Sequence, residues 1–583
     1  MPLSLLIGVL TLVPVLAALV IAGLGAVRRA LAPAVFVLCV LGALVPIICL
    51  LLLAPYLSSG EPVRVTLFGG SLAASAWFSA VYRADPFGIY AGLGLAILVV
   101  PLLLWMAWKG RLSPVAPATA TSDIVGAAPG DMDTENLDAD DELTASPARP
   151  MLSLLPSTSW AGVALTLATE TAALTILFAD NILWLALAWL VLAALIWGIG
   201  ELGAEKVDRA GLAFALAGPV LWAVGMLLGA VPAKAPALFN LMGRGAYSPL
   251  QVIVLALAIA LAGGAYPFLT WVRRRATLAT PAGLGALLLV ALPITIFAAA
   301  RTYSAAQDVT GQWTEIGQAA PPVYGGIAWA VLGAVTVAVC GLLALERRDG
   351  RTLLAYLGAA QVGWGMLALS TGDPASLAAI VLLLAGSIFG LGAMLAAMFA
   401  GATLTDDDEE PDSAGPRAFG TRFSAASLFA WCAGAVSLIG VPLFGGFAAR
   451  ELLSAAALHL GNLTVPLVAI AWAGDALLAL ALLRAIAPAF TQLAVDADAL
   501  DIEDIEDIED IKDGTDEETL AEVAANRLDD EEPGDAIDDE NREVDENEES
   551  DEDETKVALR SGARRAPSAI LRALPALVFG VLA

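Results

Sequence analysis

The sequence has very few of the residues that build metal sites and disulfide bridges. Its 583 residues include one histidine and four cysteines. The cysteines are scattered singly through apolar segments, with no C-x-x-C pair: Cys39, Cys49, Cys340 and Cys432. Cysteines of this kind usually act as small apolar residues, so we expect neither a metal site nor a disulfide. Flavin, iron-sulfur, quinone-specific and nucleotide motifs are also missing, so we expect no catalytic residue and no cofactor in this chain.

Charge is scarce in most of the chain, and long apolar runs take its place. Charged residues make up 15% of the sequence and hydrophobic residues 58%, with a mean hydropathy of +0.77. Apolar runs of about 20 residues, the length that crosses a lipid bilayer as a helix, recur along the chain. A water-soluble fold has no core large enough to bury so many. The sequence therefore predicts an all-α polytopic membrane protein.

We predict about 14 transmembrane helices from these runs. Their approximate ranges are 3–24, 31–57, 87–108, 160–179, 181–200, 210–230, 249–272, 281–301, 323–345, 352–370, 375–402, 423–458, 463–488 and 566–583. The twelfth is too long for one straight crossing. The last, with about 18 residues, is short for a complete crossing.

The basic residues predict the orientation, because Lys and Arg gather in short loops on the cytoplasmic side. One side would receive Arg28, Arg29, Lys109, Arg111, Lys206, Arg209, Arg273, Arg274, Arg275, Arg347, Arg348, Arg351, Arg417, Arg422 and Arg484. The other would receive Arg64, Arg83, Lys234, Arg244 and Arg301. This asymmetry predicts a multi-pass protein of the inner (cytoplasmic) membrane with its N-terminus outside.

The acidity of the chain is concentrated in one segment. The formal net charge is −29, and 31 of the 59 acidic residues lie between Asp496 and Glu554. Isoleucines recur there at every third position from Ile502, a spacing that matches neither a helix nor a strand. High charge with few aromatic residues predicts disorder. We interpret the run as a solvating segment, or as a tether for a basic partner or a cation-collecting arm. It gives no reason to expect nucleic acid as a partner.

These features predict six parts. They are the first three helices (1–112), an acidic disordered insert (113–159), a first five-helix repeat (160–301), a second five-helix repeat (302–490) with a short acidic loop (404–420), an acidic disordered segment (491–565) and a C-terminal helix (566–583). We expect all the acidic segments on the cytoplasmic side.

Two of the predicted spans, the seventh and the twelfth, are interrupted by glycine and proline. The residues concerned are Gly263, Gly264 and Pro267 in one span, and Gly440, Pro442, Gly445 and Gly446 in the other. The two breaks are five helices apart, so spans 4–8 and 9–13 can be superposed as two inverted repeats. Paired breaks of this kind indicate a transporter with its site near the midplane. The alternative is that Gly and Pro are simply common in membrane helices.

The candidate ion pathway consists of four of the charged residues within predicted spans: Arg450, Glu451, Asp475 and Glu170. Each costs roughly 2.5–3.5 kcal/mol at a helix centre unless it is paired or hydrated. Asp475 is either the counter-charge of Arg450 or part of a polar seam between helices. Glu170 is either a relay group or a carboxylate satisfied by a subunit contact or by neighbouring hydroxyls.

Several stretches resemble the antiporter-like membrane subunits of respiratory complex I, Mrp-type sodium/proton antiporters and membrane-bound hydrogenases. Residues 440–453 are similar to the family's Gly-Ile-Pro-Pro-Leu-Ser-Gly-Phe-x-x-Lys-Glu stretch, with Arg450 in place of the lysine. Residues 349–363 resemble its Asp-x-Lys-Arg-x-Leu-Ala-Tyr-Ser segment, and 266–271 resemble its Phe-Pro-Phe-His-Thr-Trp. Residues 83–86 and 179–183 resemble the lead-ins to its third and fifth helices.

The resemblance implies transport of protons, or exchange of protons for sodium, along buried ionisable groups. In this family a Glu on the fifth helix, a Lys on the seventh and a His on the eighth belong to the first half of the path. The matching positions here are Leu190, Ala262 and Leu287, which are apolar and cannot relay a proton. The resemblance thus implies a degenerate first half-channel.

Three functions follow as hypotheses. The first is an ion-translocating subunit of a multi-subunit cation/proton antiporter or of an NADH-quinone oxidoreductase/hydrogenase-like complex, with other membrane subunits as partners and protons or sodium as cargo. The second is a structural scaffold paralogue that has lost transport. The third is a subunit of a bicarbonate-type inorganic-ion uptake system.

Overall fold

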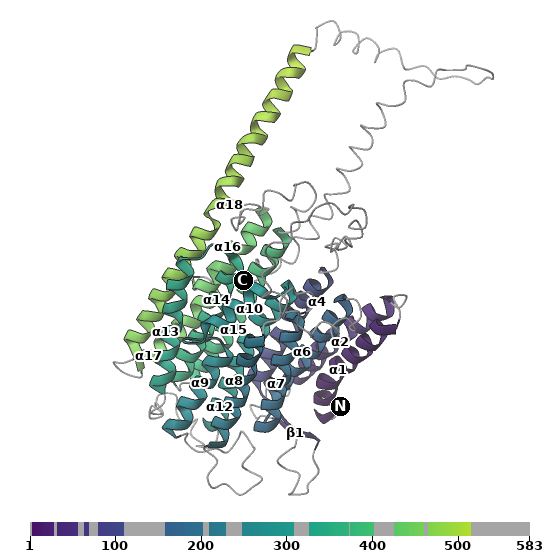
Figure 1. Cartoon of the computed structure of the whole chain (residues 1–583), viewed down its shortest axis with the longest axis vertical. Coiled ribbons are helices and arrows are strands. Elements are labelled where there is room, and N and C mark those ends of the chain that lie inside the picture. The colour runs from purple at the N-terminus through teal and green to yellow at the C-terminus, as the bar shows by residue number, and fades with distance from the viewer. Residues whose placement is uncertain are drawn as a thin grey trace, which may run out of the picture.

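The structure is a computed structural model in which helices stand side by side as a bundle (Figure 1). It describes residues 3–27, 32–55, 63–68, 80–109, 158–201, 209–228, 248–307, 326–371, 374–401, 425–442, 444–459 and 464–514. The N-terminus and strand β1 lie toward one end of the bundle, and helix α18 extends beyond the other (Figure 1).

The described part of the chain is helical apart from one hairpin. The helices are α1 (Leu3–Val27), α2 (Ala32–Leu53), α3 (Pro86–Gly94), the π segment η4 (Leu95–Val99), α4 (Val100–Lys109), α6 (Thr158–Phe178), α7 (Ile182–Glu201), α8 (Arg209–Leu228), α9 (Pro249–Ala262), α10 (Leu269–Leu278), α11 (Pro281–Ala286), the π segment η7 (Leu287–Ala291), α12 (Leu292–Gln307), α13 (Gly326–Leu345), α14 (Gly350–Thr371), α15 (Pro374–Gly401), α16 (Ala425–Ile439), α17 (Gly445–His459) and α18 (Thr464–Gly514). The strands are β1 (Val63–Phe68) and β2 (Ala80–Ala84).

Eleven of the described helical segments are long and apolar enough to cross a membrane. Two shorter apolar helices, Pro249–Ala262 and Ala426–Ile439, lie where the interrupted seventh and twelfth spans were predicted. The prediction of an all-α polytopic membrane protein is confirmed. The predicted C-terminal helix 566–583, the acidic loop 404–420 and residues 113–157 lie outside the described residues.

Several helices begin with the same two-residue signal, a short polar residue followed by proline. Asp85, Ser248 and Thr280 each cap a helix by accepting a hydrogen bond from the N–H three residues later, and a proline opens each helix. Proline suits that position, because the first N–H of a helix has no partner inside it. These caps fix the starts of α3, α9 and α11.

The hairpin was not predicted, and it holds the end of the bundle opposite the α18 extension. Strands β1 and β2 pair antiparallel, and Tyr82 of β2 bridges to Ala179 between α6 and α7. Arg301, at the same end, pairs with Asp85 (Nη1–Oδ2 2.7 Å) and donates to the carbonyls of Arg83 and Ala179. The Arg301 and Asp85 side chains, with the main-chain carbonyls of Arg83 and Ala179, thereby join β2, α12 and the α6–α7 connection.

Helix α18 runs further than the sequence indicated. It continues through Gly514, so the expected unstructured backbone of 491–565 is wrong as far as Gly514. No glycine or proline interrupts the chain between Ala489 and Asp513. Adding a residue to an existing helix needs no new nucleus, so the backbone of the last span can propagate into the acidic run. Residues 515–565 lie outside the described part.

Candidate functional site

The second broken helix is the pair α16–α17. Helix α16 ends at Ile439 and α17 begins at Gly445, with Gly440 at φ +79° between them. This left-handed conformation is open to glycine at little cost and strains other residues. Pro442 cannot donate a backbone hydrogen bond, so a continuous helix is disfavoured here. The break leaves main-chain carbonyls of α16 without helical partners, in the middle of the bundle.

A buried ion pair lies directly beside this break. The Arg450 Nε of α17 is 2.6 Å from the Asp475 Oδ2 of α18, and the side chains are 1% and 3% exposed. The indole Nε1 of Trp364, on α14, donates to the same oxygen at 2.9 Å. The Arg450 guanidinium lies over the Trp364 ring, 5.1 Å from its centroid. Asp475 was predicted to be either the counter-charge of Arg450 or part of a polar seam between helices, and in the structure it pairs with Arg450.

Arg450 also supplies hydrogen bonds to the broken backbone. Its Nη2 donates to the Leu438 carbonyl at 2.5 Å and its Nη1 to the Gly446 carbonyl at 3.1 Å. A Cβ on Gly440 would lie 3.0 Å from the Arg450 Cδ, so the small residue makes room for the guanidinium. The Arg450 side chain thus donates hydrogen bonds to carbonyls at the break and also carries the positive charge of the ion pair with Asp475.

A line of neutral polar groups continues from the pair into the bundle. Gln361 of α14 donates its Nε2 to the Leu438 carbonyl at 3.5 Å, the carbonyl that Arg450 also uses. The Ser387 Oγ of α15 lies 3.3 Å from the Gln361 Oε1, and its hydroxyl also has the Leu383 carbonyl of its own helix as an acceptor at 2.6 Å. The side chains of Arg450, Gln361 and Ser387 are all buried. The polar line therefore reaches from α18 across α17 and α14 to α15.

The other two candidate residues lie elsewhere. Glu451 is on the exposed side of α17, away from the Arg450 pair. Glu170 is 2% exposed on α6, on the same helix face as Leu167, which packs against Gly42 of α2. Neither carboxylate oxygen of Glu170 has a hydrogen-bond partner among the described residues. The pathway candidates are therefore brought together only as Arg450 with Asp475.

The hydroxyls next to Glu170 are already used by its own helix. Thr169 donates to the Leu165 carbonyl at 2.7 Å and Thr171 to the Leu167 carbonyl at 3.2 Å. Threonines in helices often bond backward in this way. The expectation that neighbouring hydroxyls satisfy Glu170 is therefore wrong.

The first broken helix is the pair α9–α10. The break contains Gly264 at φ +61° and ends before Leu269. The Tyr266 N–H donates to the Thr336 hydroxyl of α13 at 3.0 Å, and the Trp271 indole donates to the Leu261 carbonyl at 2.9 Å. Neighbouring side chains thus satisfy the backbone groups that this break frees.

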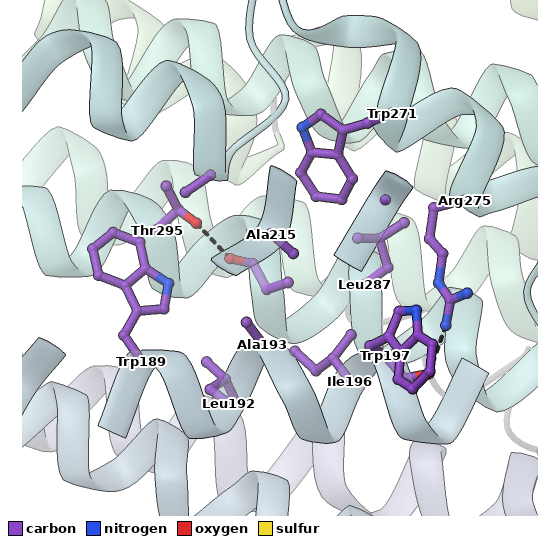
Figure 2. A pocket seen from close by; sticks show the side chains of 13 residues that line it. Trp189, Leu192, Ala193, Ile196, Trp197, Ala215, Trp271, Arg275, Leu287 and Thr295 are labelled. Carbon is purple, nitrogen blue, oxygen red and sulfur yellow. Dashed lines mark hydrogen bonds between the residues drawn. The ribbon is translucent and has the colours of Figure 1, made fainter. Parts of the chain in front are cut away.

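A cavity of about 40 Å³ lies beside the first break, between α7, α8, α10 and α12. Figure 2 shows Trp189 and Thr295 at one end and Arg275 with Trp197 at the other, and Ala262 is also in the lining. Among the described residues, no group of three or more His, Cys, Asp or Glu side chains could hold a metal ion.

Comparison with known proteins agrees with this architecture. A family model described as "NADH:quinone oxidoreductase/Mrp antiporter, TM" matches residues 155–473, more than half of the chain. The chain belongs to this family. No curated protein matches the chain in a direct comparison.

Two solved structures share the fold of this antiporter-family chain. The Mrp complex from Dietzia sp. DQ12-45-1b superposes with a TM-score of 0.60 at 18% identity, covering 83% of this chain and 80% of that one. An archaeal respiratory membrane complex, the membrane-bound sulfane sulfur reductase, gives 0.57 at 18% identity, covering 81% and 69%. These superpositions show a shared fold, and with the family match and the apolar helices they describe a multi-pass membrane protein of this family.

The positions that the family resemblance assigns to the first half of the path are apolar in this antiporter-family chain. Ala262 and Leu287 both line the cavity beside the first break, and Leu190 is on α7 next to the lining residue Trp189. Two of these three apolar positions, Ala262 and Leu287, thus meet at one cavity.

Another buried ion pair, which the sequence did not predict, includes the cavity-lining residue Arg275. Arg275 of α10 pairs with Glu201, the last residue of α7, and its Nη2 donates to the Trp197 carbonyl at 2.7 Å. Both side chains are nearly fully buried. Arg275 had been counted with Arg273 and Arg274 as a loop residue. The signal that could have identified it is its position eight residues after Pro267, the spacing of Arg450 from Pro442.

Proposed function

We propose that this chain is an ion-translocating membrane subunit of a multi-subunit cation/proton antiporter or NADH:quinone oxidoreductase-like complex. The observation that carries the proposal is the fully buried pair of Arg450 and Asp475 at a helix break. Ionisable residues inside membrane bundles are costly, and they usually mark ion or proton pathways. In our proposal the N-terminus lies outside and the arginine-rich ends of the helices face the cytoplasm.

In this proposal the Asp475 carboxylate pairs alternately with Arg450 and with the transported ion or proton. An ion or proton that reaches Asp475 neutralises the carboxylate and weakens its attraction to Arg450. The Leu438 and Gly446 carbonyls continue to hold the guanidinium in that state, so Arg450 need not leave the site. Departure of the ion restores the pair. Gln361 and Ser387 extend the site with neutral polar groups.

The first half of the family's path is degenerate in this proposal. Leu190, Ala262 and Leu287 replace groups that would ionise, so translocation depends on the second broken helix. Glu451, exposed on α17, would exchange ions with a neighbouring subunit. Glu170 is a separate candidate for binding a proton, because a buried ionised carboxylate without a partner is costly.

The purified complex in lipid vesicles tests the proposal through Asp475. In Asp475→Asn we expect ion-driven proton movement to fall by about tenfold or more, a change of about 1.4 kcal/mol in the barrier. Asp475→Glu keeps the carboxylate and should retain part of the flux. Glu346→Gln, which removes an exposed carboxylate after α13, is the matched control. An assembled Asp475→Asn complex with wild-type flux would leave only a scaffold role.

A further inference from the structure

A crevice of about 570 Å³ opens at the arginine-rich end of the bundle. It is lined by the first turns of α8 and α14, by most of the short helix α10 and by Arg347, which follows the end of α13. Because all four helices begin or end here, the crevice lies where the membrane-spanning part of the bundle meets water. Its volume falls within the roughly 300–1,000 Å³ of typical ligand pockets.

The charged residues of the crevice lining are all positive. The lining contains Arg273, Arg274 and Arg347, and it contains no acidic residue. Within the described part of the chain, neither Arg273 nor Arg347 forms an ion pair, whereas Arg275 is turned inward to Glu201. A recess with one sign of charge concentrates ions of the other sign. The crevice is therefore suited to an anion.

Hydrogen bonds hold the walls of the crevice together. Arg351 of α14 donates its Nη1 to the Ala279 carbonyl, next to the end of α10, at 2.9 Å. Two threonine hydroxyls of the lining already donate within the walls, Thr277 to a carbonyl of α10 at 2.8 Å and Thr352 to the Asp349 Oδ2 at 2.7 Å. The guanidinium groups are thus the main donors toward a ligand. Their planar N–H groups match the oxygens of a phosphate.

An exposed apolar stripe on α8 begins in the crevice. Phe214 lines the crevice and is 39% exposed, and Val220, Val224 and Leu228 are 45–51% exposed further along the helix. With 3.6 residues per turn these four residues lie on one side of α8. From Phe214 to Leu228 the stripe is about 21 Å long, more than half of the roughly 30 Å apolar thickness of a bilayer. The stripe is long enough to contact an acyl chain over one leaflet.

We propose that the crevice binds the phosphate headgroup of an anionic phospholipid, with an acyl chain of the same lipid along the α8 stripe. Basic pockets between membrane helices suit such headgroups. A free anion would use the arginines and leave the stripe unused, whereas a phospholipid uses both features. The inference goes beyond transport, because the crevice is separate from the Arg450–Asp475 pair.

Native mass spectrometry of the purified full chain, titrated with phosphatidylglycerol, tests the role of the arginines. Arg273→Gln with Arg347→Gln should weaken binding about tenfold or more, equivalent to about 1.4 kcal/mol, because each basic side chain beside an anionic headgroup adds to the affinity. Lysine at both positions keeps the charge and should retain part of the binding. Phosphatidylcholine, whose headgroup has no net charge, should bind more weakly to the wild type.

The matched control is Arg348→Gln with Arg484→Gln. It removes two exposed arginines at the same end of the bundle that do not line the crevice. This variant should bind phosphatidylglycerol like the wild type. Unchanged binding in the crevice variant, or an equal loss in the control, would overturn the proposal.

Competition distinguishes a lipid from other anions. Inorganic phosphate and glycerophosphoglycerol, the same headgroup without acyl chains, should not displace phosphatidylglycerol at equal concentration. Displacement by either would assign the crevice to a free anion and overturn the proposal. Lipid binding that appears only after deletion of residues 515–565 would assign the crevice to this acidic segment of the chain, which would also overturn it.

Discussion

Asp475→Asn alone is expected to destabilise the protein by about 3–5 kcal/mol, because it leaves Arg450 as a buried charge without its partner. Arg450 is 1% exposed and cannot turn to water without opening the packing of α17 against α15 and α18. Its remaining bonds to the Leu438 and Gly446 carbonyls do not neutralise it. Equilibrium unfolding in mixed micelles, compared between the variant and the wild type, measures the loss.

The double variant Arg450→Gln with Asp475→Asn separates charge from packing. Removing both members of a buried ion pair is often close to neutral, since the cost of burying the charges also disappears. We therefore expect the double variant to be more stable than Asp475→Asn alone by most of the single variant's loss. If the two variants are equally unstable, the ion pair is not what holds this site together.

Gly446→Ala is the second change with a large expected effect. A Cβ on Gly446 would lie 2.0 Å from the Ser437 carbonyl oxygen and 3.1 Å from the Arg450 Nη1. The first contact is with backbone, which cannot rotate away, so α16 and α17 would have to separate. Overpacking of this kind costs about 1–3 kcal/mol or more, and the same movement would displace Arg450 from Asp475. We expect both the free energy of unfolding and the ion flux to decrease.

The neighbouring glycine gives a matched control for that change. A Cβ on Gly445 would meet nothing within 4 Å. Ala is favoured over Gly in the middle of a helix by roughly 0.5–1 kcal/mol. Gly445 is the first residue of α17, where this preference is smaller, so Gly445→Ala should be neutral or slightly stabilising. Equal effects of the two substitutions would mean that the close approach of α16 to α17 at Gly446 is not important.

The sequence was informative about the second broken helix because its charges are isolated in an apolar span. Because Arg450 and Asp475 lie inside apolar spans, they cannot be loop residues. The free-energy cost of a charge within the membrane predicted a partner for each of them. What the sequence could not decide was whether they pair with each other. That depends on α18 packing against α17 across the break, which brings residues 25 positions apart to 2.6 Å.

Arg275 and Glu201 were missed for the opposite reason. Arg275 is the last of three consecutive arginines, and Glu201 lies at the end of its span, so both resemble residues of a water-exposed boundary. The structure buries only the third arginine, because α10 begins at Leu269 and its inner face holds Leu269, Val272 and Arg275. The start of α10 after the break determines which arginine faces inward, and the charge pattern alone contains no information about it.

The hairpin and the long α18 show two further limits of a hydropathy-based prediction. Residues 63–68 and 80–84 are too short for a span, and β2 contacts the α6–α7 connection and α12, which lie far away in the sequence. The isoleucines of 502–511 have no helical period, yet the backbone of α18 continues through them.

The ion flux of the double variant, Arg450→Gln with Asp475→Asn, tests the central claim most directly. This variant should assemble and unfold much like the wild type, so a loss of flux cannot be attributed to instability. We predict that complexes carrying it, in vesicles with an imposed ion gradient, move protons at about one tenth of the wild-type rate or less, a change of about 1.4 kcal/mol or more in the barrier. Wild-type proton movement by the assembled double variant would contradict the account.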